Sequence, residues 1–228
     1  VTQSPTKYMD GHAAQVGGAI VDGGTFDWDT YKEKFPGLTT PDLSYHGLTY
    51  SQEFKSAAYI TKACVHLMRD LGSIPSPMNS YMLNLGLESL AVRVERHCSN
   101  AQKAAEYLYN RKEVSWVNYS GLPSDPHYDL AQKQFTEGRS CGVLCFGLKG
   151  GRDNAIKFMD SLQLINIVTH VADAHSCMLH PASHTHRQMT DEQLIAAGVD
   201  PDLTRFSVGL ENIEDIIADL DQAFKAID

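Results

Sequence analysis

Short apolar segments alternate with amphipathic ones in the second half of the chain, and this alternation constrains the fold more than any other feature. The apolar segments predict strands over residues 114–119, 141–151, 165–171 and 203–210. The intervening segments predict helices over residues 125–135, 153–162 and 213–224. Strands that alternate with helices in this way predict a layer of helices packed on a small sheet.

The first half of the chain has a different pattern. The run VGGAIV at 16–21 predicts a buried strand that ends in a glycine turn, and 26–35 predicts a short helix. Residues 38–53 predict a long loop, and its aromatic side chains favour a functional role. Helical spacing over 57–73 predicts a helix that ends at Gly72.

A long helix is predicted from Pro77 to about Asn110. Ser76 is expected to cap it, because a serine before a proline is a common start of a helix. The second half of this helix is more polar, and helices of this length often join two domains. We therefore predict a domain boundary near residue 100, with domains 1–100 and 101–228.

Composition and charge exclude several classes of function. The chain has 228 residues, is 43% hydrophobic and 21% charged, and carries a formal net charge of -9. Nucleic acids and anionic membranes attract clusters of basic residues, which an acidic chain does not offer. No apolar run is long enough to span a bilayer. The five cysteines form no CxxC pair, so we expect a reduced, cytoplasmic protein without disulfides.

Lys7 is the first candidate for chemistry. A lysine attacks a carbonyl group as the neutral amine, a form that desolvation or nearby positive charge favours. The hydroxyls of Ser4 and Thr6 flank it, and hydroxyls in a turn bind phosphate well. A Schiff-base lysine beside phosphate-binding hydroxyls suits pyridoxal phosphate (PLP), although a Ser-x-Thr-Lys stretch is more often a solvated surface turn.

Arg205 is the second candidate, because it lies within the apolar segment LTRFSVGL. It either forms a structural ion pair with Asp202 or Glu211, or binds the carboxylate of a substrate through its planar guanidinium group. The histidine-rich stretch at 170–186 permits a metal site, but a hydrogen-bonded loop fits better because no HExxH helix or cysteine pair accompanies it. No nucleotide-binding glycine motif and no GxSxG motif occurs.

The stretch SPTKYMDGH at 4–12 resembles the S-x-TKY-x-GH signature of the Cys/Met-metabolism PLP-dependent enzymes, which have fold type I. Other segments follow in the order that this family shows. They are FPGLTTPDLSYHGLTY, MRDLGSIPSPMNSY, LGLESLAVRVERHCSNA, VLCFGLKGG, VADAHSCMLHPASHTHRQM and LTRFSVGLENIEDIIADL. The segments PDLSYHGL and LESLAVRVERH are most similar to the O-acetylhomoserine sulfhydrylase branch.

The resemblance implies an α/β fold, namely the C-terminal part of a fold type I transferase. Residues 1–100 would be a remnant of the PLP-binding large domain, and 101–228 a small α+β domain. The implied site residues are the PLP-binding and catalytic Lys7, the phosphate ligands Ser4 and Thr6, the substrate-carboxylate ligands Arg205 and Ser176, and Tyr45 at the active-site mouth. The resemblance implies no metal.

The implied reaction converts O-acetylhomoserine and sulfide, or a thiol, to homocysteine or methionine and acetate, in a homotetramer. Cystathionine γ-synthase, cystathionine γ-lyase and methionine γ-lyase activities are alternatives. The chain starts about halfway along a family member, so a non-catalytic C-terminal fragment is another alternative. Two residues depart from the V-G-D-A-K-S stretch of the branch: Ala172 replaces the glycine and His175 the lysine. The extra methyl group at 172 is expected to narrow or shift the loop that carries Ser176.

Overall fold

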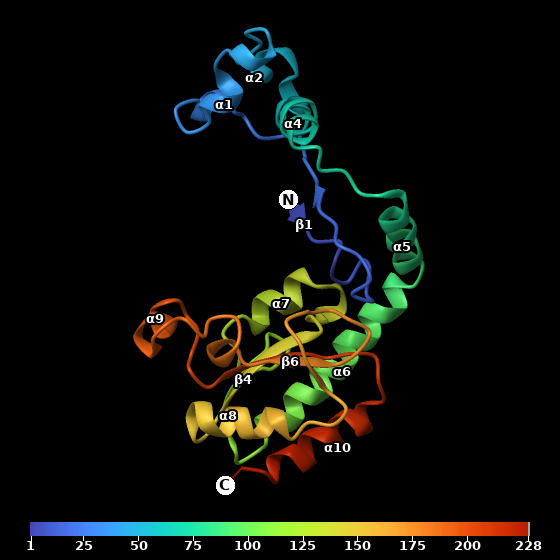
Figure 1. The fold of residues 1–228 in the computed structure, drawn as a ribbon, viewed down its shortest axis with the longest axis vertical. Helices are drawn as coiled ribbons and strands as arrows, with labels where there is room; N and C mark the ends of the chain where they lie inside the picture. Colours follow the sequence, from blue (N-terminus) through green and yellow to red (C-terminus); the bar gives the residue numbers. More distant parts are fainter. Residues whose placement is uncertain (228) are drawn as a thin grey trace. The chain divides into compact units, whose positions relative to one another are not determined.

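The computed structural model describes residues 1–227 and divides into two compact units, which are treated separately (Figure 1). Unit 1 comprises Val1–Pro5 and Val16–Met82. Unit 2 comprises Thr6–Gln15 and everything from Leu83 onward. This division differs from the predicted boundary near residue 100, because side chains between residues 86 and 100 bind the segment around Lys7 and the C-terminal sheet.

Unit 2 is built on a five-stranded sheet with the strand order β3-β4-β7-β6-β5. Its strands are β3 (Val114–Asn118), β4 (Val143–Leu148), β5 (Asn166–Ile167), β6 (Cys177–Leu179) and β7 (Leu203–Ser207). The β5–β6 pair is parallel and the other pairs are antiparallel. Strand β6 falls within a predicted loop, and β5 is much shorter than predicted.

Three helices cover one face of this sheet (Figure 1). They are α6 (Leu90–Tyr109), α8 (Gly151–Asp160) and α10 (Ile213–Phe224). Alternate residues of the strands point into the core that these helices enclose, as Leu144 and Phe146 of β4 do, both of which are buried. The predicted arrangement of helices on a sheet is confirmed. Two shorter helices, α7 (Tyr128–Gln134) and α9 (Asp191–Ala196), complete the unit.

Asp219 links α10 to the segment that follows α8. Its side chain is 6% exposed. The carboxylate accepts hydrogen bonds from the backbone amides of residues 163, 164 and 165, at 2.9, 3.0 and 2.9 Å. These amides would otherwise lack partners where the chain leaves α8, so the carboxylate fixes the start of β5.

The predicted long helix from Pro77 is two helices, α5 (Pro77–Glu88) and α6. The break occurs at Ser89, whose φ and ψ of -106° and 3° leave the helical range. The predicted cap is confirmed, because the Ser76 hydroxyl accepts a hydrogen bond from the amide of Asn79 at 3.1 Å. The helix caps at Thr190 and Asn212 form as their sequences indicate.

Unit 1 consists mainly of short helices. They are α1 (Pro36–Thr39), α2 (Tyr50–Glu53), α3 (Ala58–Lys62) and α4 (Arg69–Leu71), and a π-helical segment (Ala63–Met68) joins the last two. The extent predicted for the helix at 57–73 is therefore confirmed. The predicted loop at 38–53 was wrong, since it contains α2 and a 3₁₀ turn at Leu43–Tyr45.

The predicted buried strand at 16–21 was also wrong in its burial. Only β2 (Ala19–Ile20) forms, and it pairs with β1 (Thr2–Gln3). Val16 and Val21 are 78% and 58% exposed. Apolar composition indicated burial, but among residues 1–227 these two side chains of the ribbon segment stay exposed. Across residues 1–227, no helix combines the length and apolar character that crossing a membrane requires.

Candidate active site

Lys7 lies in a turn that belongs to unit 2. The amide of Gly11 donates a hydrogen bond to the Lys7 carbonyl at 2.8 Å, which closes the turn. Gly11 has a φ of +73°, a left-handed conformation that favours glycine. The Gly11 carbonyl in turn accepts a hydrogen bond from the amide of Ala174 at 2.8 Å. The turn is therefore attached to the loop that precedes Ser176.

Tyr8, the next residue, attaches the same turn to the start of β4. Its hydroxyl oxygen accepts a hydrogen bond from the amide of Gly142 at 2.9 Å, and its ring meets the edge of His97 with centroids 5.3 Å apart. Burial raises the pKa of Tyr8 far above its usual range. His97 is fully buried, and its Nδ1 lies 2.7 Å from the Val208 carbonyl oxygen. The chain that follows Lys7 is thus anchored at both Tyr8 and Gly11.

Gly86 allows α5 to approach this turn closely. A Cβ atom at position 86 would overlap the backbone of Met9 and Asp10. We predict that Gly86→Ala lowers the free energy of unfolding by about 2 kcal/mol through this overlap. Alanine normally stabilises a helix relative to glycine by about 1 kcal/mol, so the expected sign is reversed.

Chemical denaturation of the two proteins measures this effect. Asn84→Ala is the matched control, because Asn84 is exposed on the same helix, and we expect it to leave stability unchanged or slightly raised. A stabilised Gly86→Ala protein would contradict the close approach.

Arg205 lies in the middle of β7, on the face of the sheet opposite the helical layer. Its Nη2 donates to the carbonyl oxygens of Thr169 and His170, at 2.8 and 3.1 Å. Its Nε is buried without a hydrogen-bond partner among residues 1–227. The predicted ion pair does not form, because the carboxylates of Asp202 and Glu211 bind Ser115 and Ser176 instead.

His170 connects the surroundings of Lys7 and Arg205. Burial lowers the pKa of His170, and the positive charges of Lys7 and Arg205 lower it further, against the opposing effect of Asp173 and Asp10. Its Nε2 is buried and unpartnered among the described residues. Two cations, Lys7 and Arg205, and two carboxylates, Asp10 and Asp173, therefore act on His170 together.

Ser176 is fully buried and saturated on its donor side. Its amide and its hydroxyl both donate to the carboxylate of Glu211, at 2.6 and 2.9 Å. The hydroxyl oxygen accepts a hydrogen bond from the amide of Gly209 at 2.9 Å. A substrate carboxylate needs donors, and both donors of Ser176 are already used within the chain. The structure thus shows Ser176 holding the loop to the end of β7.

Ala172 is buried and has a φ of +64°. Its amide donates to the hydroxyl of Ser207 at 2.8 Å. A left-handed conformation is costly for a residue with a Cβ, whereas the glycine expected at this position adopts it freely. The backbone at Ala172 therefore has the conformation that suits glycine.

The other predicted residues are divided between the two units. Ser4 is exposed in unit 1 and Thr6 is partly buried in unit 2. Tyr45 belongs to unit 1, where its ring stacks on Tyr50 with centroids 6.1 Å apart. The guanidinium of Arg69 lies 5.6 Å from the Tyr45 ring centroid. Ser4 and Tyr45 thus belong to unit 1, whereas Thr6 and Lys7 belong to unit 2.

The histidine-rich loop is hydrogen-bonded to its surroundings. The nitrogens of His180 lie 2.9 Å from the Ser183 hydroxyl and 2.9 Å from the Pro201 carbonyl oxygen. His184 also contacts the Ser183 hydroxyl. Among residues 1–227, no group of three or more metal-ligating side chains converges.

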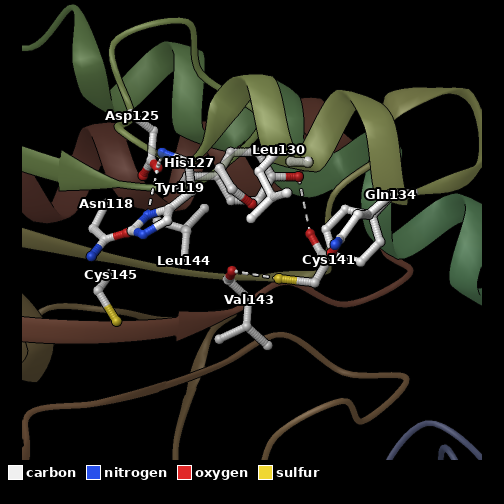
Figure 2. Close-up of a pocket in the computed structure, with 13 residues that line it drawn as sticks. Asn118, Tyr119, Asp125, His127, Leu130, Gln134, Cys141, Val143, Leu144 and Cys145 are labelled. Carbon is white, nitrogen blue, oxygen red and sulfur yellow. Dashed lines mark hydrogen bonds and ion pairs between the residues drawn. The ribbon is translucent and has the colours of Figure 1, made fainter.

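A separate pocket of about 400 Å³ lies between α7 and β4 (Figure 2). Tyr119, Leu130 and Cys145 are among the residues that line it, and none of the predicted site residues does. Cys145 pairs directly with Arg205 across the β4–β7 ladder, so one residue of the pocket wall neighbours Arg205 on the sheet. Burial raises the pKa of the Cys145 thiol, which keeps it protonated and unreactive.

Three residues that hold this region escaped sequence reasoning: Arg93, His97 and Glu211. The first two lie on a helix with ordinary amphipathic spacing, and Glu211 was considered only as a partner of Arg205. Buried charged or polar residues are the informative signal here, and burial is not visible in the sequence alone.

Comparison with known proteins places this geometry in a family. Residues 1–225 match the model of the Cys/Met metabolism PLP-dependent enzymes. The chain is 43% identical to an O-acetyl-L-homoserine sulfhydrylase of Leptospira meyeri over all of the chain and 53% of that protein. It is 45% identical to O-acetyl-L-homoserine sulfhydrylase 1 of Thermus thermophilus over 98% of the chain and 52% of that protein.

A solved structure agrees with these relatives. It is an O-acetylhomoserine (thiol)-lyase of Campylobacter jejuni that contains a pyridoxyl-lysine monophosphate residue. Its TM-score is 0.86 at 35% identity, over 98% of this chain and 53% of that one. The chain spans about half the length of the relatives it matches. At these levels of similarity, the chain belongs to the family of Cys/Met metabolism PLP-dependent enzymes.

Proposed function

We propose that this chain supplies the cofactor lysine and the carboxylate-binding arginine of an enzyme that makes homocysteine. The reaction is a γ-replacement, in which the bond between Cγ and the acetate oxygen of O-acetylhomoserine breaks and sulfide forms a bond to Cγ. Acetate leaves with the electron pair, and sulfide loses a proton. A thiol in place of sulfide would give methionine or a related thioether.

The observation that carries this proposal is the state of Arg205. Two backbone carbonyls hold its Nη2, so the guanidinium group is already oriented. Its Nε is buried without a partner among the described residues, which leaves this N–H donor for an acceptor. A hydrogen bond from a charged guanidinium group to a carboxylate is stronger than one between neutral groups. An α-carboxylate is the group common to all amino-acid substrates.

Lys7 fits the role of the residue that binds PLP covalently. Its turn is held in place by hydrogen bonds of the neighbouring residues Tyr8 and Gly11. PLP bound there would draw electrons away from the α-carbon of the substrate. Lys7, once its amine is free and neutral, is suited to take the proton from the α-carbon and return it at a neighbouring carbon.

The remaining site residues are proposed with less direct roles. Ser4 and Thr6 offer hydroxyl donors for the cofactor phosphate, as the family signature implies. Ser176 would shape the carboxylate site through Glu211 and Gly209, since its own donors are used. Tyr45 is proposed to contact the substrate at the mouth of the site.

The surroundings of the enzyme are also part of the proposal. A cytoplasmic location is supported by five cysteines that are all free. Assembly with further copies of the protein is supported by large exposed apolar side chains such as Leu71, Ile74 and Met78, which are 76%, 72% and 63% exposed. The acidic net charge supports small-molecule substrates over nucleic acids or membranes.

Reductive trapping tests the cofactor assignment. The chain is mixed with PLP and reduced with borohydride, and the labelled peptide is identified by mass spectrometry. We expect the label to concentrate on Lys7 and to disappear from that peptide in Lys7→Ala. A label spread over surface lysines, and unaltered by Lys7→Ala, would refute the assignment of Lys7 in this chain.

A further inference from the structure

A buried arginine binds the backbone of the residue next to Lys7. Arg93 lies in the first turn of α6 and is only 5% exposed. Its Nη1 donates a hydrogen bond of 2.9 Å to the carbonyl oxygen of Tyr8. Since that oxygen belongs to the peptide bond between Tyr8 and Met9, the hydrogen bond fixes the plane of this peptide.

The break between α5 and α6 orients the guanidinium group. The helix is interrupted at Ser89, and the carbonyl oxygen of Gly86 accepts a hydrogen bond from Arg93 Nη2 at 2.6 Å, beside longer ones from the Ser89 amide and hydroxyl at 3.3 and 3.4 Å. The Ser89 hydroxyl accepts one from Nε at 2.9 Å. These two hydrogen bonds hold the planar guanidinium group in a single orientation. In this orientation its remaining nitrogen, Nη1, faces the carbonyl oxygen of Tyr8.

A stabilising role alone would not require a buried cation. Burying a guanidinium group costs several kcal/mol, and a long apolar side chain fills the same volume without that cost. The carboxylate of Asp10 offsets part of the charge of Arg93, but that carboxylate also accepts hydrogen bonds from the amides of His12 and Ala14. The guanidinium group adds hydrogen bonds of fixed direction, which an apolar side chain cannot form.

The other hydrogen bonds of the turn involve groups other than the carbonyl of Tyr8. The Tyr8 ring and hydroxyl fix the side chain of that residue, and the carbonyl of Gly11 fixes the far end of the turn. Among the hydrogen bonds of the described residues, the one from Arg93 holds the carbonyl of Tyr8. A rotation of this peptide would move the backbone from which the Lys7 side chain projects.

We propose that Arg93 is a positioning residue, which aims the Lys7 amine by holding the carbonyl of Tyr8. The inference rests on the proposed function, in which Lys7 binds the cofactor. Helix α6 would then contribute to the geometry of the site through Arg93, although none of the side chains of α6 needs to touch the substrate.

Three variants test this role. Arg93→Met removes the directed hydrogen bonds and keeps the bulk, and Arg93→Lys keeps the charge and restores one donor. Arg96→Met is the matched control, because Arg96 on the same helix also binds backbone carbonyls, those of Leu210 and Glu211. Two quantities are measured: hydrogen exchange of the Gly11 amide without PLP, and the rate of PLP trapping at Lys7.

We expect Arg93→Met to speed exchange of the Gly11 amide and to slow trapping at Lys7, each at least tenfold, while Arg96→Met changes neither. Arg93→Lys should recover most of the trapping rate, which a loss of general stability would not explain. Wild-type rates in a folded Arg93→Met protein would overturn the inference. If the wild-type chain is not labelled at Lys7, the proposed function fails, and exchange at Gly11 still decides whether Arg93 fixes the turn.

Discussion

Arg205→Met is expected to raise the KM for O-acetylhomoserine at least 100-fold in the protein that carries this chain. A hydrogen bond between a charged guanidinium and a carboxylate contributes roughly 1.5–3 kcal/mol, and the variant loses this bond together with the positive charge. Since two carbonyls already orient the side chain, little of this energy is spent on ordering it. Steady-state kinetics at saturating sulfide measures the effect.

The substrates themselves provide one control for this prediction. Sulfide has no carboxylate, so its KM should stay within about twofold if Arg205 acts only on the α-carboxylate. Arg205→Lys should recover part of the loss, because it keeps the charge but not the fork. Arg152→Met, at an arginine bonded to Asp191 and Ala182 on the far side of α8, should change neither constant. An unchanged KM for O-acetylhomoserine in Arg205→Met would remove the carboxylate role.

Asp219→Ala is expected to lower the free energy of unfolding by about 4 kcal/mol. The change leaves three backbone amides without acceptors, and each unsatisfied buried donor costs about 1–3 kcal/mol. Asp219→Asn keeps one carbonyl oxygen and should lose about half as much. Denaturant titration followed by circular dichroism measures both.

Asp160→Ala is the control for this prediction. Asp160 is exposed at the end of α8, and its replacement should change stability by less than about 0.5 kcal/mol. Equal losses in Asp219→Ala and Asp160→Ala would show that the amide contacts do not stabilise the fold.

Local signals in the sequence predicted the parts of the fold that local physics determines. The caps at Ser76, Thr190 and Asn212 follow from side chains that bond amides two or three residues away. The strands β3, β4 and β7 follow from dense apolar runs. Strand β6 did not, because its residues become a strand only through pairing with β7, which is distant in sequence.

The same distinction applies to the site. Lys7 and Arg205 were found because their residue types are unusual in their local context, although their assigned roles are still predictions. Arg93 was not, because an arginine in an amphipathic helix looks like a solvated one until the helix break at Ser89 and the turn around Tyr8 are seen together. The break itself has no proline, and only Gly86 hinted at it.

The route of the chain between the two units has a consequence for how the protein can be divided. The chain enters unit 2 at Thr6, leaves it after Gln15 and returns at Leu83. A single proteolytic cut between Gln15 and Leu83 would not release Lys7. Residues 6–15 would stay bound to the rest of unit 2 through their own contacts. A gene segment that begins at Leu83 would encode the sheet, its helices and Arg205, but not Lys7. Lys7 can therefore be inherited or exchanged together with the sheet only if residues 6–15, the first segment of unit 2, are included.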